Sequence, residues 1–171
     1  MSKKYAIIAL TGIAAVLAAA PSSKAAVTAA NNYKQGKVYK ITPKSKPFKN
    51  KYVKAPTYNK KTRTYFTIRS YMEKFQKAKK GTLVLKKGTY KITNTIQVPS
   101  NVTIILEKGA KIVKSNQTGT KKMKAATTIF QLIKPSNREK SNVYGGHNGE
   151  KNIHFVGKGS NVMNLKYLKA N

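Results

Sequence analysis

Residues able to carry out acid–base chemistry are few in this chain of 171 residues, which contains four glutamates, two histidines, no cysteine and no aspartate. The glutamates are Glu73, Glu107, Glu139 and Glu150. Hydrolysis of a glycosidic bond requires two carboxyl groups that flank the bond. Only Glu139 and Glu150 share one segment, and the lysines around them account for both as balancing charges. The sequence therefore predicts no pair of catalytic carboxylates.

The residue types also give little support for lyase chemistry or for a metal site. A calcium-assisted lyase requires several oxygen ligands, mostly carboxylates, and a metal-free lyase requires a desolvated lysine, which no linear pattern identifies. His147 lies in a glycine-rich loop, and His154 lies between Ile153 and Phe155. A strand that buries Ile153 and Phe155 directs His154 outward, and two histidines alone do not form a metal site. We therefore expect both histidines at the surface, with no metal and no other cofactor.

Positive charge is the dominant chemical property, because 35 lysines and arginines face only four acids and give a formal net charge of +31. The first 25 residues carry three of the lysines, so the remainder keeps a charge of +28. Charge of this size, spread over the whole chain, favours anionic polymers or surfaces as partners. The candidate ligand-binding residues lie in two polar segments, 117–124 and 134–151. They are Lys121, Lys122, Lys124, Tyr144, His147 and Lys151.

The N-terminus has the pattern of an export signal. Lys3 and Lys4 precede an uncharged apolar run, Ala6 to Ala20, and Ser23-Lys24-Ala25 is a small-x-small cleavage site. The apolar run is too short to span a bilayer, so we expect a cleaved signal peptide over 1–25 and no transmembrane anchor in the mature chain. A lysine-rich exported chain without cysteine fits the outside of a Gram-positive bacterium. The expected location is extracellular, with attachment to the cell wall as a variant.

The elements that position these residues are predicted first by an internal repeat. The segment 83–92 recurs as 104–113, so that Gly88 aligns with Gly109. Each copy contains an apolar strand, a charged pair, a glycine and a second short strand. A unit of this length cannot bury its own apolar face, so copies must stack on one another. The repeat predicts coils of a parallel β-solenoid.

An amphipathic helix is predicted over residues 65–81, immediately before the first coil. Its apolar face consists of Ile68, Tyr71, Met72, Phe75 and Ala78. Ser70 and Glu73 have the spacing of a capping box, although the helix could also begin earlier, at Thr64 or Thr67. Gly81 is the predicted C-terminal stop. We expect the helix to cover the open end of the core, with its apolar stripe as core rather than as a cofactor site.

Residues 26–64 form a basic lead-in in which lysines alternate with aromatic residues. The aromatic residues are Tyr39, Phe48, Tyr52 and Tyr58, and Pro43, Pro47 and Pro56 interrupt any regular element. Two interpretations remain open at this point. The aromatic rings stack on the bases or sugars of a ligand, or the lead-in is a disordered or loosely draped arm whose rings cover an exposed edge.

The coils are expected to occupy residues 82–171. Further strands are predicted at Thr128–Ile133, Ile153–Gly159 and Val162–Leu168. No capping element precedes Asn171, so the prediction is a truncated stack of about three to four incomplete coils.

Several motifs together resemble the pectin-lyase-like right-handed parallel β-helix proteins, which include pectate lyases and polygalacturonases. Besides the helix, the motifs are Gly81-Thr82-Leu83, Lys87-Gly88-Thr89-Tyr90, Val98-Pro99-Ser100-Asn101-Val102-Thr103 and Gly157-Lys158-Gly159. The resemblance covers about residues 64 to 165 and implies an all-β right-handed solenoid with an N-terminal capping helix. In relatives, the catalytic acids or calcium-binding aspartates lie on later coils. Relatives often carry an isoleucine–aspartate pair after the Gly-x-Gly, where this chain has Asn161-Val162-Met163-Asn164.

The sequence thus predicts a secreted β-helix module without catalytic residues, associating electrostatically with an acidic polysaccharide or an anionic cell-wall polymer. The alternative is the N-terminal part of a pectate-lyase-like or polygalacturonase-like enzyme whose catalytic coils are missing. Nucleic acid is a third class of partner, supported by charge alone.

Overall fold

The computed structural model describes residues 31–141, 143 and 149–164, and most of its regular structure is parallel β-sheet with few helices. The predicted signal peptide lies outside these residues. The strands are β1 (Val38–Ile41), β2 (Gly81–Leu85), β3 (Gly88–Ile92), β4 (Ile96–Gln97), β5 (Val102–Leu106), β6 (Ala110–Lys114), β7 (Phe130–Gln131), β8 (Ile153–Gly157) and β9 (Val162–Asn164). The helices are α2 (Asn50–Val53), α3 (Arg63–Ala78) and a 3₁₀ turn, η1 (Pro135–Asn137).

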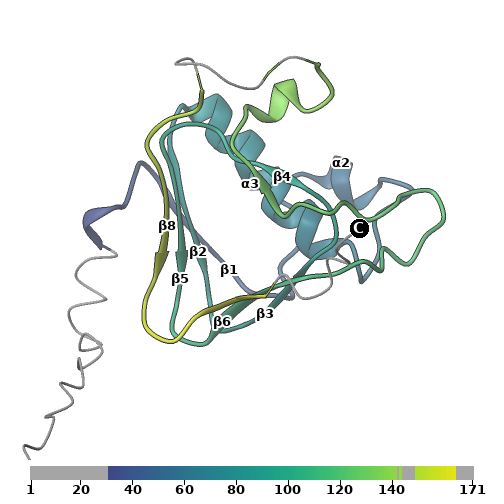
Figure 1. Ribbon diagram of the computed structural model, residues 1–171, viewed down its shortest axis with the longest axis horizontal. Helices are drawn as coiled ribbons and strands as arrows, with labels where there is room; N and C mark the ends of the chain where they lie inside the picture. The colour runs from purple at the N-terminus through teal and green to yellow at the C-terminus, as the bar shows by residue number, and fades with distance from the viewer. Residues whose placement is uncertain (1–30, 142, 144–148, 165–171) are drawn as a thin grey trace, which may run out of the picture.

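From β2 onward, successive strands enter three sheets in turn. Sheet A has the order β1-β2-β5-β8, sheet B the order β3-β6-β9, and sheet C the order β4-β7, with every pairing parallel. Figure 1 shows sheet A on one side of the molecule, β3 and β6 along a second side and β4 on the third. Each round of the chain therefore lies on the previous round, and the inner faces of the three sheets enclose one core.

The predicted strands are found at the expected positions, but some of them are shorter than predicted. The predicted strand Ile153–Gly159 contains β8, whereas Thr128–Ile133 yields only the two residues of β7. β9 begins at Val162 as predicted, and the residues from 165 onward lie outside the described part of the chain. Within the described residues, no helix has the length and apolar character needed to cross a membrane.

Alternation along each strand fills the core. The buried inward side chains of the first two rounds are Leu83, Leu85, Tyr90, Ile92, Ile96, Val98, Ile104, Leu106 and Ile112. In a strand, successive side chains point to opposite faces, so the residues between these lie on the outer faces of the sheets. On sheet A, Val84 and Ile105 are buried there in a small second cluster against Val156. Thr89, Lys91 and Lys111 are such outer residues on sheet B.

The repeat predicts the register of the first strand pair correctly and that of the second pair wrongly. Leu83 lies opposite Ile104, as aligned, but Gly88 lies opposite Ala110 rather than Gly109. Gly109 stays in the turn before β6, where its positive φ of 81° suits glycine. A shift of one residue exchanges the two faces of a strand. As a result Lys114, opposite Ile92, takes an inward position and is only 2% exposed.

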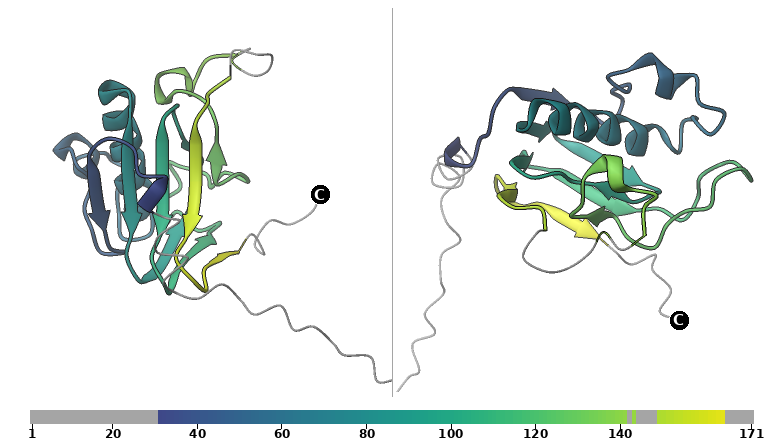
Figure 2. Two further views of the ribbon diagram at one scale, coloured as in Figure 1. Left: turned by 90° about the vertical axis from the view of Figure 1, so that its left-hand side faces the viewer. Right: turned by 90° about the horizontal axis from the view of Figure 1, so that it is seen from above.

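The predicted helix is confirmed in its position and in part of its apolar face, since Tyr71 is only half-buried and Ala78 is exposed. Ile68, Met72 and Phe75 are buried in the core cluster, and α3 packs on β2, β3 and β4. Seen from above in Figure 2, α3 lies along one end of the stacked strands, with β9 at the other end. The helix begins at Arg63, so the predicted capping box is wrong. Ser70 is buried within the helix, where its hydroxyl donates to the Thr67 carbonyl at 2.7 Å.

Gly81 is not the helix stop. The helix ends at Ala78, Lys79 adopts the left-handed conformation with φ of 61°, and Gly81 is the first residue of β2. An added Cβ at Gly81 would lie under 3.0 Å from three ring atoms of Phe75. Glycine is therefore needed because α3 and β2 approach each other closely here.

From residue 31 onward, the lead-in is an ordered part of the fold rather than a draped arm. Its strand β1 pairs with β2, with Val38 opposite Thr82. The rings of Tyr52 and Tyr58 pack on Phe66 of α3 at centroid distances of 6.0 and 5.9 Å. For these two rings the covering interpretation holds, since apolar packing against α3 accounts for them.

Candidate functional site

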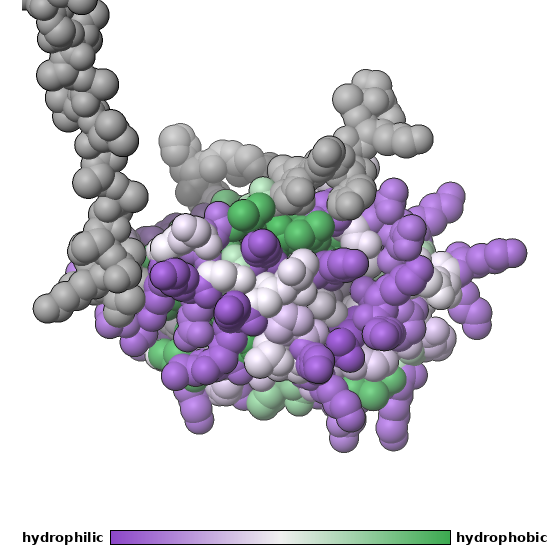
Figure 3. Space-filling model, turned by 90° about the horizontal axis from the view of Figure 1, so that it is seen from below, coloured by the Kyte–Doolittle hydropathy of each residue, from purple (hydrophilic) through white to green (hydrophobic). Residues whose placement is uncertain are grey.

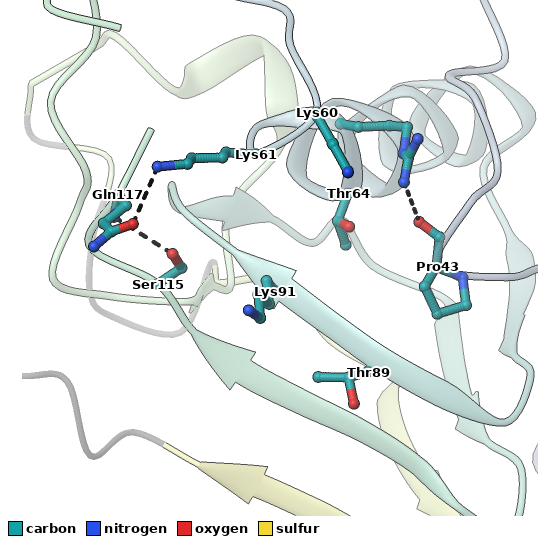
Figure 4. Close-up of a pocket in the computed structure, with 9 residues that line it drawn as sticks. Pro43, Lys60, Lys61, Thr64, Thr89, Lys91, Ser115 and Gln117 are labelled. Carbon is teal, nitrogen blue, oxygen red and sulfur yellow. Dashed lines mark hydrogen bonds between the residues drawn. The ribbon is translucent and has the colours of Figure 1, made fainter. Parts of the chain in front are cut away.

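A basic cleft of about 400 Å³ lies between the start of α3 and the outer face of sheet B. Its lining comprises Pro43, Lys60, Lys61, Arg63, Thr64, Thr89, Lys91, Ser115 and Gln117. Figure 3 views the molecule from the side along which β3 and β6 run, and hydrophilic side chains project from most of this face. In Figure 4, Lys60 and Thr64 lie on one side of the cleft, and Thr89 and Lys91 lie on the other.

The strand side of the cleft follows from the alternation of β3. Tyr90 and Ile92 are completely buried, so Thr89 and Lys91 must project outward. Lys111, opposite Thr89 in the register, is exposed on the neighbouring strand β6. Sheet B therefore continues the positive surface of the cleft across two strands.

The helix side of the cleft is organised by Arg63, the first residue of α3. Its Nη2 donates to the Pro43 carbonyl at 3.3 Å, which fixes the guanidinium. Its Nε is buried and has no hydrogen-bond partner among the described residues. A buried N–H without a partner is costly, and the first turn of α3 contains no acidic residue. An anionic oxygen in the cleft would be attracted by the charge of Arg63 and by the positive end of the helix dipole.

The loop after β6 is attached to this site. Lys61 Nζ donates to Gln117 Oε1 at 3.1 Å, a bond drawn in Figure 4, and Asn59 Nδ2 donates to the Thr118 carbonyl at 3.0 Å. Three predicted ligand-binding lysines follow on the same loop and are exposed. They are Lys121, Lys122 and Lys124. The structure thus places this lysine-rich segment beside the cleft, although none of the three lines it.

The other predicted residues are not brought to the cleft. Lys151 lies before β8, where its backbone N–H donates to Ser100 Oγ at 2.9 Å. Tyr144 and His147 lie outside the described residues. Sequence reasoning missed the cleft residues Lys60, Lys61, Arg63 and Lys91. Only Lys91 had a usable signal, since it alternates with the apolar residues of β3.

The glutamates of the chain lie away from the cleft. Glu73 pairs with Lys51, Arg69 and Arg138 at 3.5, 3.2 and 3.8 Å. Glu150 accepts hydrogen bonds from the Ser100 backbone and hydroxyl at 2.5 and 2.6 Å. Neither these two nor Glu107 and Glu139 line the cleft. Its positive charge is therefore not neutralised from within the lining.

His154 lies on the outer face of sheet A, the side predicted for it. Its Nε2 is 2.8 Å from Asn152 Oδ1, and its ring is 4.8 Å from that of Tyr33. Its neighbour Phe155 is 40% exposed rather than buried. Phe155 faces the core side, opposite Ile104, but β8 is the last described strand of sheet A and no further round covers it.

Comparisons of this chain with protein-family models, with curated proteins and with solved structures found no match in any of the three. The geometry and charge of the described residues therefore carry the functional argument.

Proposed function

We propose that this chain is a secreted, non-catalytic module that binds an acidic polysaccharide or an anionic cell-wall polymer through the basic cleft. The observation that carries the proposal is the composition of the lining. Lys60, Lys61, Arg63 and Lys91 surround the cleft without any carboxylate. Cations that have no internal counterions are matched to an anionic ligand.

A polymer of acidic sugar or polyol units suits the rest of the lining. Thr64, Thr89, Ser115 and Gln117 contribute hydroxyl and amide groups that exchange hydrogen bonds with ligand hydroxyls. Beyond the cleft, Lys111 and the lysines of the 117–124 loop remain exposed. A long ligand is therefore able to contact positive side chains outside the cleft as well as within it.

We propose further that the three parallel sheets are the start of a right-handed parallel β-helix of the pectin-lyase-like type, with α3 as its cap. The rotation of successive strands through sheets A, B and C supports this architecture. Export through the predicted signal peptide and an extracellular or cell-wall location complete the proposal.

The cleft is tested by replacing Lys60, Lys61 and Lys91 with alanine. We expect about tenfold weaker binding to polygalacturonate at low salt, because each lost contact between exposed charges is worth up to ~1 kcal/mol. Isothermal titration calorimetry over a range of salt concentrations measures both the affinity and its salt dependence. Wild-type binding should weaken steeply toward physiological salt, where the Debye length is about 8 Å.

The matched control replaces Lys86, Lys87 and Lys108, three exposed lysines outside the cleft, with alanine. This variant loses the same net charge and should keep most of the affinity. Equal losses in the two variants, or equal binding to a neutral glucan, would refute the cleft. Tighter binding to DNA than to polygalacturonate and teichoic acid would instead favour the nucleic-acid class.

A further inference from the structure

A second cavity, of about 590 Å³, lies between β1 and the C-terminal half of α3. Its floor contains the aromatic rings of Tyr39, Phe48 and Phe75, and five lysines and no acid line it. We call it the β1 groove. It shares no lining residue with the basic cleft.

The floor of the β1 groove is apolar but lies under positive charge. The Tyr39 ring lies 6.3 Å from that of Phe48 and 5.9 Å from that of Phe75, and Phe48 remains 46% exposed. Lys74 Nζ is 3.7 Å from the Phe48 ring centroid and 5.3 Å from that of Tyr39. An apolar group entering the groove would therefore meet an aromatic surface, and a neighbouring acid would meet Lys74 or Lys37.

One side of the groove is an open edge of sheet A. β1 pairs with β2 on one side, and no described strand pairs with it on the other. The Lys37 carbonyl accepts a hydrogen bond from the backbone N–H of Thr82 at 3.1 Å, and the Ile41 carbonyl accepts one from the backbone N–H of Lys86 at 2.9 Å. In a parallel ladder alternate residues bond to the same neighbour, so the backbone groups of Val38 and Lys40 point away from β2. Val38 is 37% exposed.

We propose that the β1 groove binds an extended acidic peptide segment of a partner protein, which pairs with the free edge of β1. An added strand would bond to the backbone of Val38 and Lys40 and alternate its side chains between the aromatic floor and the solvent. Free backbone donors and acceptors select a peptide, since a polysaccharide has no matching ladder. A second copy of this chain does not fit, because its mature charge of +28 would meet the lysines of the groove.

The test titrates the mature full-length chain with a short, end-blocked peptide in which glutamate alternates with valine and phenylalanine. A second peptide of the same sequence carries N-methyl groups on alternate backbone nitrogens, on the edge that would face β1. We expect the unmodified peptide to bind about tenfold more tightly, because N-methylation removes donors of the ladder. Equal binding of the two peptides would overturn the proposal and leave attraction by charge alone.

Two variants locate the binding on the molecule. Phe48→Ala removes an exposed ring and should weaken peptide binding about tenfold. The cleft variant of Lys60, Lys61 and Lys91 should leave peptide binding within about twofold, so failure of the cleft proposal and of this one are distinguishable. A circular dichroism melt verifies that the Phe48 variant is folded. Unchanged peptide binding by the folded Phe48 variant, or peptide binding lost with the cleft lysines, would refute the site.

Discussion

Replacing Gly81 with alanine is expected to destabilise the fold by about 3 kcal/mol or more, or to prevent folding. The new Cβ would lie under 3.0 Å from three atoms of the Phe75 ring. Phe75 is 1% exposed and belongs to the core cluster beneath α3, so its ring has no free space to move into. Either α3 must move away from β2 or the ring must leave its rotamer.

Chemical denaturation of the variant and of the wild type measures this loss. Gly149→Ala is the matched control, because a Cβ there meets no atom within 4 Å, and its effect should stay within about 0.5 kcal/mol. In a Gly81→Ala background, Phe75→Leu makes room for the methyl group and should recover part of the lost stability. A Gly81→Ala protein as stable as the wild type would mean that α3 does not pack against the first residue of β2.

The elements with strong periodicity were predictable from the sequence. Ile68, Met72 and Phe75 recur at helical spacing, and the structure buries all three in α3. The helix has one apolar face to bury, and this requirement leaves a single orientation. The repeat also predicts Leu83 opposite Ile104 correctly, in two strands whose side chains are buried on both faces.

The register of β3 and β6 was not predictable from the repeat alone. An alignment of the two glycines would place Tyr90 opposite Lys111, whereas in the structure Tyr90 lies opposite Ile112. The alternation of Ala110, Lys111 and Ile112 already indicates that Lys111 points outward. Local alternation therefore prevailed over the similarity of the turns. The observed register buries Ala110 and Ile112 and puts its inward lysine, Lys114, at the end of β6, where the Nζ reaches backbone carbonyls.

The basic cleft was beyond sequence reasoning for a different reason. Its lining comes from four separate parts of the chain, near Pro43, Lys60, Thr89 and Ser115. Their convergence depends on β1 joining sheet A and on α3 lying across the first round. The sequence assigned the lead-in no strand, so nothing in it indicated that Lys60 and Lys91 face one space. The lysine-rich loop was found because composition alone identifies it.

Lys114 carries the second large expected effect, because replacing it with methionine should make the protein more stable at neutral pH. The side chain is 2% exposed, and its Nζ donates to the carbonyls of Thr93 and Ser115 at 2.9 and 2.8 Å. In the variant, the Thr93 carbonyl keeps a hydrogen bond from the Ala126 backbone N–H. Among the described contacts, only the Ser115 carbonyl is left without a donor. Removing a buried charge in exchange for an apolar group of similar length should add about 1–2 kcal/mol to the free energy of unfolding.

The pH dependence of that difference tests its cause. Burial lowers the pKa of Lys114 below its ordinary value of 10.5. Between the two pKa values the unfolded chain binds the proton that the folded chain has lost, so the stability of the wild type rises with pH up to about 10.5. The methionine variant lacks this rise, and its advantage over the wild type should shrink as pH increases through that range.

Tyrosine ionisation acts in the opposite direction and is common to both proteins. Burial raises the pKa of Tyr52 and of Tyr90, so folding keeps their neutral forms and stability falls as pH rises above 10.0. Subtracting the two denaturation series removes this contribution. Lys111→Met, at an exposed position on the same strand, removes an equal charge and controls for the change in net charge. A less stable Lys114→Met protein, with a difference that stays constant up to about pH 10.5, would mean that the three carbonyl contacts of the ammonium outweigh its burial.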